Sequence, residues 1–286
     1  MEDFGTIISN SLTSIFTSIF SSLDNSFYYI LDNLAFINTT ILDNPMLTKI
    51  LNTNKTSGIL AICNSLILAF ILYYSIRHLF SHLIYSKTES PKEFIIKAIV
   101  FGILMNNSIW FCEQLIFIID FCSSFLIYTA EQVSNLSISF SEFIKLLNSS
   151  LFWTENANNL FSFSGIVKSF SSLGLVNLVF SFSLRYIMVL VLIMFSPFAF
   201  LCLLTNSTSW IFKSWIKTFL SLLIYQLLIA FILIISFSFG SLATTLLSSV
   251  FYVGTIQALE RSDHFIKEIL GGISISANTF SNFKTN

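Results

Sequence analysis

Two long apolar runs with a short polar stretch between them dominate the second half of the chain. The first run covers residues 185–204 and reads RYIMVLVLIMFSPFAFLCLL, and the second covers residues 219–239. Each has about the 20 residues that an α-helix needs to cross the hydrocarbon core of a bilayer. The stretch between them carries two tryptophans and two lysines, namely Trp210, Lys213, Trp215 and Lys217. Because indole rings and lysines favour the depth of the lipid headgroups, this pattern predicts a helical hairpin whose turn faces the cytoplasm.

Further apolar segments extend the prediction to about five spans. Gly58–Ile76 and Phe94–Cys112 are strong candidates, and residues 241–259 are a weaker one because they are rich in Ser and Thr. We expect Pro91 to open the helix of the second candidate, because a proline is tolerated in the first turn, and Gly240 to break the pattern before the weaker one. Residues 113–133 are apolar but interrupted by Asp120, so an amphipathic helix and a weak further span both remain open. The predicted fold is all-α, a polytopic transmembrane helical bundle with an amphipathic N-terminal helix.

The apolar residues of the first run continue upstream of residue 185, as far back as Leu173. The whole stretch from Leu173 to Leu204 would form a helix of roughly 48 Å, whereas the hydrocarbon core is about 30 Å thick. We expect Arg185 to lie at the outer interface and to break the run, leaving Tyr186–Leu204 as the span and residues 170–184 as a Ser-rich helix along the bundle. Pro197 should kink this span and free a backbone carbonyl.

The N-terminal segment shows helical rather than span-like patterning. Between residues 4 and 34, apolar side chains recur at i, i+3, i+4 and i+7, which predicts an amphipathic helix. Its polar face has no Lys or Arg, whereas a helix drawn to anionic lipid would carry cations there. The pattern therefore favours packing against protein, and the alternative is a helix that lies on neutral lipid. Residues 35–57 are predicted to be a connection.

Composition places the chain among integral membrane proteins. Of its 286 residues 55% are hydrophobic and only 10% are charged, whereas soluble domains average about 25% charged residues. The net charge of −1 points neither to nucleic acid nor to acidic ligands as direct partners. The chain starts with an acidic Met-Glu-Asp, so we expect an internal span rather than a cleavable signal peptide to direct it to the membrane.

The distribution of Lys and Arg predicts an orientation with the N-terminus outside. With five spans, nine cationic residues fall on the cytoplasmic side: Arg77, Lys87, Lys92, Lys97, Lys213, Lys217, Arg261, Lys267 and Lys284. Four fall outside: Lys49, Lys55, Lys145 and Lys168. This excess agrees with the positive-inside rule, and the chain is predicted to be a multi-pass protein of the inner (cytoplasmic) membrane. Without the fifth span the count becomes six against seven, and the first loop alone then supports the orientation.

These observations divide the chain into five parts. We expect residues 1–57 (helix and connection) and 113–172 (amphipathic and polar) to lie outside. We expect residues 58–112 to form a transmembrane hairpin with a cytoplasmic basic loop, and residues 173–259 a transmembrane region with the cytoplasmic Trp/Lys turn. Residues 260–286 are predicted to be a polar cytoplasmic tail.

The residues give no sign of catalytic chemistry, and we predict neither an enzyme nor a metal or cofactor site. Motifs such as GxSxG, HExxH and the phosphate-binding glycine loops are absent, and the four cysteines are scattered, as small buried side chains would be. Ionisable residues within a span are functional candidates by default, and here they are Asp120 and Arg185. An interfacial position is available to both, and we favour it. The amide of Gln226, inside the last strong span, completes the set of candidate channel residues.

Three stretches of the second half form a recognisable set: the span that ends in SPFAFLCLL, the string TSWIFKSW with Thr208, Trp210, Phe212 and Trp215, and the glutamine-containing LLIYQLL. Together they resemble the TrbL family, the polytopic inner-membrane channel subunits of type IV (conjugative) secretion systems. The tail motif IKEILGGISIS adds to the match, which covers roughly residues 173–280 and hardly touches the first 57.

The resemblance implies a homo-oligomeric pore component that helps to move DNA or protein across the membrane. It also implies other secretion-channel subunits and separate ATPases as partners, together with membrane lipids and transient contact with the translocated substrate. The membrane domain of a small-molecule transporter is the alternative. That alternative requires a polar pocket within the membrane, which the sequence does not display.

Overall fold

The computed structural model of the chain confirms the all-α prediction. It describes residues 25–43, 45–51, 58–84, 90–152, 163–205, 207–240 and 245–270, and these contain helices and turns but no strand. Most of the predicted N-terminal helix, residues 4–24, lies outside the described part. Its last third is present as α2 (Asn25–Ala35), which η1 (Thr39–Asp43) and α3 (Pro45–Leu51) follow.

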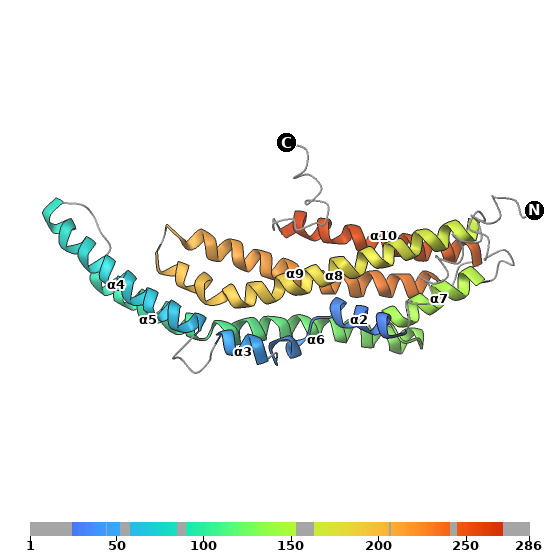
Figure 1. Cartoon of the computed structure of the whole chain (residues 1–286), viewed down its shortest axis with the longest axis horizontal. Helices are drawn as coiled ribbons and strands as arrows, with labels where there is room; N and C mark the ends of the chain where they lie inside the picture. The colour runs from blue at the N-terminus through green and yellow to red at the C-terminus, as the bar shows by residue number, and fades with distance from the viewer. Residues whose placement is uncertain are drawn as a thin grey trace, which may run out of the picture. The chain divides into compact units, whose positions relative to one another are not determined.

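Most of the remaining described residues lie in longer helices, with the short 3₁₀ turn η2 after the longest of them (Figure 1). In chain order they are α4 (Ile59–Ile84), α5 (Pro91–Asn106), α6 (Ser108–Ser134), α7 (Phe140–Phe152), α8 (Phe163–Leu201), η2 (Cys202–Leu204), α9 (Ser209–Gly240) and α10 (Thr245–Leu270). The predicted start at Pro91 and the predicted end at Gly240 both coincide with helix ends.

Four of the described helices are long and apolar enough to cross a membrane. They are α4, α6, α8 and α9, over Ile59–Phe80, Ser108–Ser134, Leu173–Leu204 and Ser209–Phe239. This is the pattern of a multi-pass membrane protein. Residues 113–133, for which the sequence left an amphipathic helix and a weak span open, belong to α6 and so to one of these four helices. α10, which holds the weaker candidate at 241–259, is not among them.

The predicted span Phe94–Cys112 is wrong, because a helix boundary falls inside it. Asn107 ends α5 in a non-helical conformation, and its side-chain Nδ2 donates to the carbonyl of Ile103 at 2.8 Å. Asparagine competes for local backbone groups in this way and so favours helix ends. α5 therefore has only 16 residues, and the next apolar helix begins at Ser108.

The predicted break at Arg185 is also wrong, because α8 continues through it as a single helix of 39 residues. The expectation rested on the cost of burying a guanidinium. Arg185 is indeed buried, at 5% exposed, but the partners in the protein that are described below offset the cost of that burial. The helix accordingly does not have to end where its charge lies.

The chain folds into two compact units, each assembled from segments that are far apart in sequence. The first contains residues up to Ile37, Ile119–Tyr186 and Leu223 onward. The second contains Asn38–Ile118 and Ile187–Leu222. Three of the long helices, α6, α8 and α9, contribute residues to both units.

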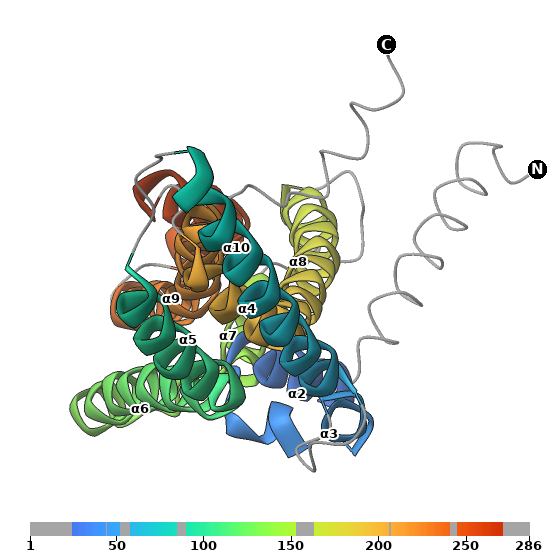
Figure 2. The same ribbon diagram turned by 90° about the vertical axis from the view of Figure 1, so that its left-hand side faces the viewer.

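The first unit has a large apolar core supplied by five helices in addition to α6. α9 runs beside α8 and α10 runs beside α9, as Figure 1 shows from the side and Figure 2 nearly end-on. Aromatic rings meet edge to face within this core, including Phe140 with Phe182 and Phe143 with Tyr252. Edge-to-face pairs of this kind add about 0.5–1.5 kcal/mol each to the burial of the rings.

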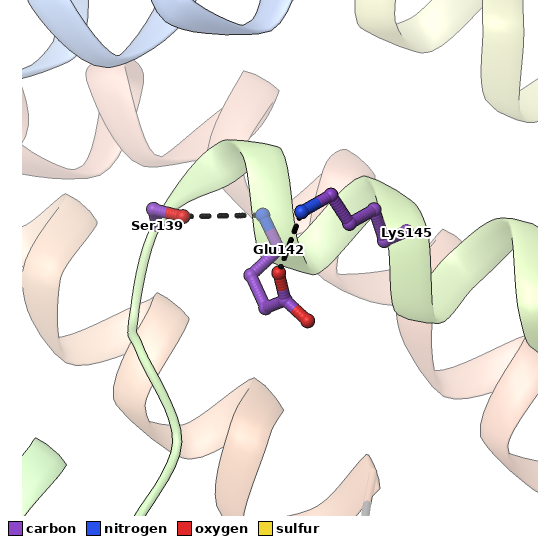
Figure 3. A network of polar contacts seen from close by, with 3 residues as sticks. All are labelled: Ser139, Glu142 and Lys145. Atoms are coloured by element: carbon purple, nitrogen blue, oxygen red, sulfur yellow. Dashed lines mark hydrogen bonds and ion pairs between the residues drawn. The ribbon is translucent and has the colours of Figure 1, made fainter. Parts of the chain in front are cut away.

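A local capping arrangement fixes the start of α7 in the first unit. The Ser139 hydroxyl accepts from the backbone N–H of Glu142 at 3.1 Å, and Lys145 turns back to the Glu142 carboxylate at 3.1 Å (Figure 3). Serine at this position satisfies one of the N–H groups that every helix start leaves without a partner. The region 113–172, predicted to be amphipathic and polar, thus contains the helix α7.

The second unit contains the α4–α5 hairpin. Asn64 of α4 and Asn106 of α5 exchange reciprocal amide hydrogen bonds at 3.3 and 3.2 Å, as expected for a polar side chain within an apolar helix pair. At the other end of the pair the rings of Tyr74 and Phe94 stack with centroids 3.7 Å apart. Leu204, at the end of η2, belongs to the same apolar cluster as Phe94, so the turn after α8 lies beside α5.

Candidate functional site: a polar network among buried helices

Gln226, one of the predicted site residues, is the centre of a polar network in the first unit. It is completely buried on α9. Its Oε1 accepts from the backbone N–H of Ile37 at 3.0 Å, and its Nε2 donates to the hydroxyl of Ser123 on α6 at 2.8 Å. One amide therefore joins α9 to α6 and to the end of the α2 segment, across 189 residues of sequence in the case of Ile37.

Asp120 joins the same network from α6. Its carboxyl group lies close enough to the Gln226 amide to interact with it, and its backbone carbonyl accepts from the Ser123 hydroxyl at 2.9 Å. The Asp120 side chain is half-buried. A carboxylate, an amide and a hydroxyl from two long apolar helices thus meet at one point, where each needs the others because few other polar partners are close.

Arg185 holds the end of α2 from α8. Its Nη1 donates to the carbonyl of Ala35 at 3.0 Å, and its guanidinium lies 5.1 Å from the centre of the Tyr225 ring. Ala35 is the last residue of α2, where carbonyl groups lack partners within the helix and the helix dipole is negative. A buried cation placed there satisfies an acceptor and complements the dipole at the same time.

Tyr225 extends the contacts to α10. Its hydroxyl donates to the carbonyl of Leu259 at 2.8 Å, and the Ser262 hydroxyl lies 3.3 Å from it as a donor. Tyr225 and Gln226 are neighbours in sequence, yet one contacts α10 and the other contacts α6 and the α2 segment. These two residues of α9 therefore hold three other elements.

Asp32 gives α2 a second polar anchor. Its Oδ1 accepts from the backbone N–H of Phe140 at 2.8 Å, at the start of α7. Burial raises the pKa of the Asp32 carboxyl, and the hydrogen bonds from the N–H groups of Phe140 and Ser141 act in the opposite direction. Thus α2 offers a carboxylate to the positive end of α7 and receives a cation at its own negative end.

The tryptophan hairpin lies in the second unit and has a different character. Trp215 is 4% exposed, and its Nε1 donates to the carbonyl of Leu192 on α8 at 2.9 Å. Its ring stacks on Phe219 and packs against Phe200 and Phe212 with centroids 5.4, 5.8 and 5.7 Å away. The buried Pro197 lies within the helical segment between Leu192 and Phe200.

The other hairpin residues point outward. Trp210 is 66% exposed, and Lys213 and Lys217 are exposed as well. The hairpin turn itself is shorter than the polar stretch suggested, because α9 begins at Ser209 and all four Trp/Lys residues lie in its first turns. At about 100° per residue, Trp210 and Trp215 lie about 140° apart around the helix. One indole therefore packs against α8 while the other is exposed.

The seven predicted site residues are Asp120, Arg185, Pro197, Trp210, Lys213, Trp215 and Gln226. Asp120, Arg185 and Gln226 lie around the end of α2, although nothing in the sequence indicated that they would be neighbours. Trp210, Lys213 and Trp215 lie at the start of α9, and Pro197 lies in α8. Ser123, Tyr225 and the backbone of Ala35 and Ile37 could not be identified as partners from the sequence. For Ser123 the only available signal was a short polar side chain in an apolar helix. Ser is so common in this chain that this signal does not distinguish Ser123 from the other serines.

The hydrogen bonds of the network run between α2 with the residues after it, α6, α8, α9 and α10, and their clearest effect is to hold these helices together. Within the described residues no group of three or more His, Cys, Asp or Glu side chains could hold a metal ion. Cys63, Cys112, Cys122 and Cys202 are all free thiols, although Cys122 is exposed rather than buried. Comparisons of the chain with protein-family models, with curated proteins and with solved structures gave no match.

Proposed function

We propose that the chain is the membrane-embedded subunit of a type IV (conjugative) secretion channel and helps to translocate DNA or protein across the inner membrane. Four helices capable of crossing a membrane give the coarser class, that of a multi-pass membrane protein. The specific function rests on the resemblance of residues 173–280 to the TrbL family.

The observation that carries the proposal is that the separate stretches of the resemblance contact one another. Phe200, from SPFAFLCLL, packs against Phe212 and Trp215, from TSWIFKSW, with ring centroids 5.0 and 5.8 Å apart. Residues that form one packed cluster constrain one another. A shared cluster explains why these stretches would occur together, and it makes a chance likeness of two unrelated apolar segments a poorer explanation.

The burial of the candidate spans supports a role in an assembly. Within the chain, 44% of the most apolar 18-residue stretch of α8 and 50% of that of α9 are buried, against 11% for α4 and 17% for α6. α4 and α6 therefore leave wide apolar faces for lipid or for neighbouring subunits. In our proposal the chain forms a homo-oligomer with α8 and α9 as its rigid centre, and separate ATPases supply the energy.

The polar network favours a second candidate, the membrane domain of a small-molecule transporter. A solute carrier needs polar groups within its apolar helices, and Asp120, Arg185 and Gln226 supply them. Against this, the described bonds of Gln226 are made to Ile37 and Ser123 rather than left available for a solute. The network is better suited to fixing helices than to binding and releasing a ligand.

Deletion and complementation in the native host distinguish these functions. We expect loss of the gene to abolish transfer of a marked element, or export of the secreted protein, and leave growth on all carbon and nitrogen sources unchanged. Wild-type chain and the Trp210→Ala variant should restore transfer, and the Trp215→Ala variant should not. Normal transfer in the deletion strain, or a growth defect confined to one nutrient, would exclude the channel proposal.

The proposed orientation places residues 77–93 in the cytoplasm and residues 131–165 outside. Single cysteines in each region of a variant lacking the four natural cysteines should react differently with a membrane-impermeant maleimide on intact cells. We expect labelling in residues 131–165 alone, because the basic loop is retained inside. Labelling in residues 77–93 alone would reverse the orientation.

A further inference from the structure

A pocket of about 280 Å³ lies between α8 and α10 in the first unit and shares no residue with the polar network. The two helices run in the same direction here, because Gly174 lies against Ile256 and Asn177 lies against Glu260. The volume is close to the lower end of the range of ligand sites, roughly 300–1,000 Å³, so it suits a small ligand. The walls include Phe170, Leu173, Gly174 and Asn177 on α8, and Gln257 and Glu260 on α10.

Gly174 sets the spacing of the two helices at the pocket. A Cβ atom at position 174 would lie 2.7 Å from Cγ2 of Ile256 and 3.7 Å from Oε1 of Glu260. The first distance is too short for any side chain, so a larger residue would push α10 away from α8. Glycine thus allows the close approach that brings the Glu260 carboxylate against α8.

Glu260 gives the pocket a negative charge. Its Oε1 accepts from the Asn177 amide at 3.0 Å, which holds the carboxylate against α8. Among the described residues Glu260 takes part in no ion pair, whereas Glu142 is paired with Lys145. A partly buried carboxylate without a cation partner attracts a positively charged ligand that can donate hydrogen bonds.

The acceptors around Glu260 match the donors of a primary ammonium group. Because Asn177 donates through its Nδ2, its Oδ1 is left to accept. Gln257, one turn before Glu260 on α10, lines the same pocket and adds an amide oxygen. A primary ammonium group has three N–H donors and no acceptor, so each donor can meet an oxygen of Glu260, Asn177 or Gln257.

The other end of the pocket is apolar and accessible. Phe170 is 52% exposed and Leu173 is 65% exposed, and both line the pocket. A ligand that enters there places its apolar part against these two side chains and its cation further along α8, beside Asn177 and Glu260. Short alkylamines and the side chain of lysine have this shape, an apolar chain with the charge at its tip.

The pocket lies on the part of α8 that a membrane span does not need. The apolar stretch of this helix ends at Leu204, and the roughly 20 residues that cross a hydrocarbon core reach back from there to Arg185. All the pocket residues of α8 precede Arg185. On this count a water-soluble ligand has access to the pocket.

We infer that this pocket binds a primary ammonium group carried on a short apolar chain. The ammonium group donates to Glu260, Asn177 and Gln257, and the chain lies against Phe170 and Leu173. A free alkylamine and a lysine side chain of another polypeptide both supply this group, and titration distinguishes the two sources. The inference does not depend on the secretion proposal.

Isothermal titration calorimetry of the full-length protein in detergent micelles tests the site, with titration into protein-free micelles subtracted. Pentylamine is the free amine, and Nα-acetyl-lysine amide presents the lysine side chain as a polypeptide does. Pentanol has the apolar chain without the charge, and N,N,N-trimethylpentylammonium has the charge without N–H donors. We expect pentylamine to bind about tenfold or more tighter than either of these two controls.

The comparison of the two ammonium compounds identifies the source of the group. Tighter binding of pentylamine than of the lysine amide would identify a free amine as the ligand. Equal or tighter binding of the lysine amide would identify a polypeptide side chain.

Substitutions of Glu260 then locate the binding. Glu260→Gln keeps the shape and removes the charge, so affinity for pentylamine should fall about tenfold or more. Glu268→Gln, the same change at an exposed position of the same helix, should alter it less than about twofold. Glu260→Lys should abolish binding of pentylamine and create binding of pentanoate, which has a similar chain and the opposite charge. Loss of folding could not produce that gain.

Three results would each overturn the inference. The first is unchanged affinity for pentylamine in Glu260→Gln. The second is binding of pentanol or of the trimethylated compound as tight as that of pentylamine. The third is binding of neither pentylamine nor the lysine amide to wild-type protein whose circular dichroism shows folded helices.

Discussion

Trp215 and Trp210 provide the sharpest single comparison in the hairpin, because two identical side chains five residues apart have opposite surroundings. Trp215 is 4% exposed and contacts three aromatic rings, whereas Trp210 is 66% exposed. Truncation of a buried Trp to Ala costs about 3–5 kcal/mol, and truncation at an exposed position typically changes stability by about 0.5 kcal/mol or less. We therefore expect Trp215→Ala to lower the free energy of unfolding by several kcal/mol and Trp210→Ala to leave it nearly unchanged.

A third variant separates the hydrogen bond from the packing. Trp215→Phe retains an aromatic ring but removes the N–H that donates to Leu192 at 2.9 Å. A hydrogen bond of this kind contributes about 0.5–1.5 kcal/mol net. At about 1 kcal/mol against about 4 kcal/mol, the hydrogen bond accounts for about a quarter of the loss in Trp215→Ala, so Trp215→Phe should be clearly the more stable of the two variants.

The assay is reversible unfolding of the purified protein in mixed micelles, with SDS as denaturant and helical circular dichroism as the signal. Oligomer yield after crosslinking is measured on the same samples, since the cluster around Trp215 also lies at the proposed rigid centre. Equal losses for the two alanine variants would refute the reasoning. A Trp215→Phe variant as unstable as Trp215→Ala would also refute it, because the packing of the aromatic ring would then contribute nothing to stability.

Three further predictions concern the polar contacts, and each uses the same unfolding assay. Gln226→Leu leaves the buried N–H of Ile37 without its acceptor and should cost about 1–3 kcal/mol, and a neutral result would show that the network is not structural. In a double-mutant cycle, Asn64→Ala and Asn106→Ala should show a coupling of about 0.5–1.5 kcal/mol, whereas strict additivity would mean that the amide pair does not form. The raised pKa of Asp32 means that the folded state holds its proton more tightly than the unfolded state, so this contribution favours folding at acid pH and is lost as the pH rises above 3.8 through the raised value. Asp32→Asn should remove the part of the pH dependence that sets in as the pH rises above 3.8, and superimposable profiles for the two proteins would contradict the assignment.

Local patterns were sufficient for the class of fold and for several helix ends. The apolar runs predicted an all-α membrane protein, Pro91 predicted the start of α5 and Gly240 the end of α9. Each of these features depends on residues within a turn or two of one another. Propensity and periodicity therefore carry the information.

The boundaries that failed depended on distant partners or on a single side chain. Arg185 does not interrupt α8 because Ala35, 150 residues away, accepts its hydrogen bond. Nothing near Arg185 in the sequence reports that partner. Asn107 interrupts what hydropathy alone presents as a continuous run, because hydropathy does not register the competition of an asparagine side chain for the Ile103 carbonyl.

The polar network could be predicted only as separate residues. The bond between Ile37 and Gln226 spans 189 residues, and the bond between Gln226 and Ser123 spans 103. Tertiary contacts of this range leave no periodic signal. The residue types nevertheless gave a usable hint, since a fully buried amide in an apolar helix must find a partner somewhere.

The most direct test of the channel proposal is capture of the translocated substrate in living cells. A photoreactive amino acid placed at Ser124, an exposed position next to Ser123 of the network, would be activated during active transfer, with the same substitution at exposed Trp210 for comparison. The account predicts crosslinked adducts that contain the transferred DNA or the exported protein, and their disappearance when the secretion ATPases are inactivated. Adducts with lipid alone, while transfer proceeds at its normal rate, would contradict the proposal that this chain forms part of the path.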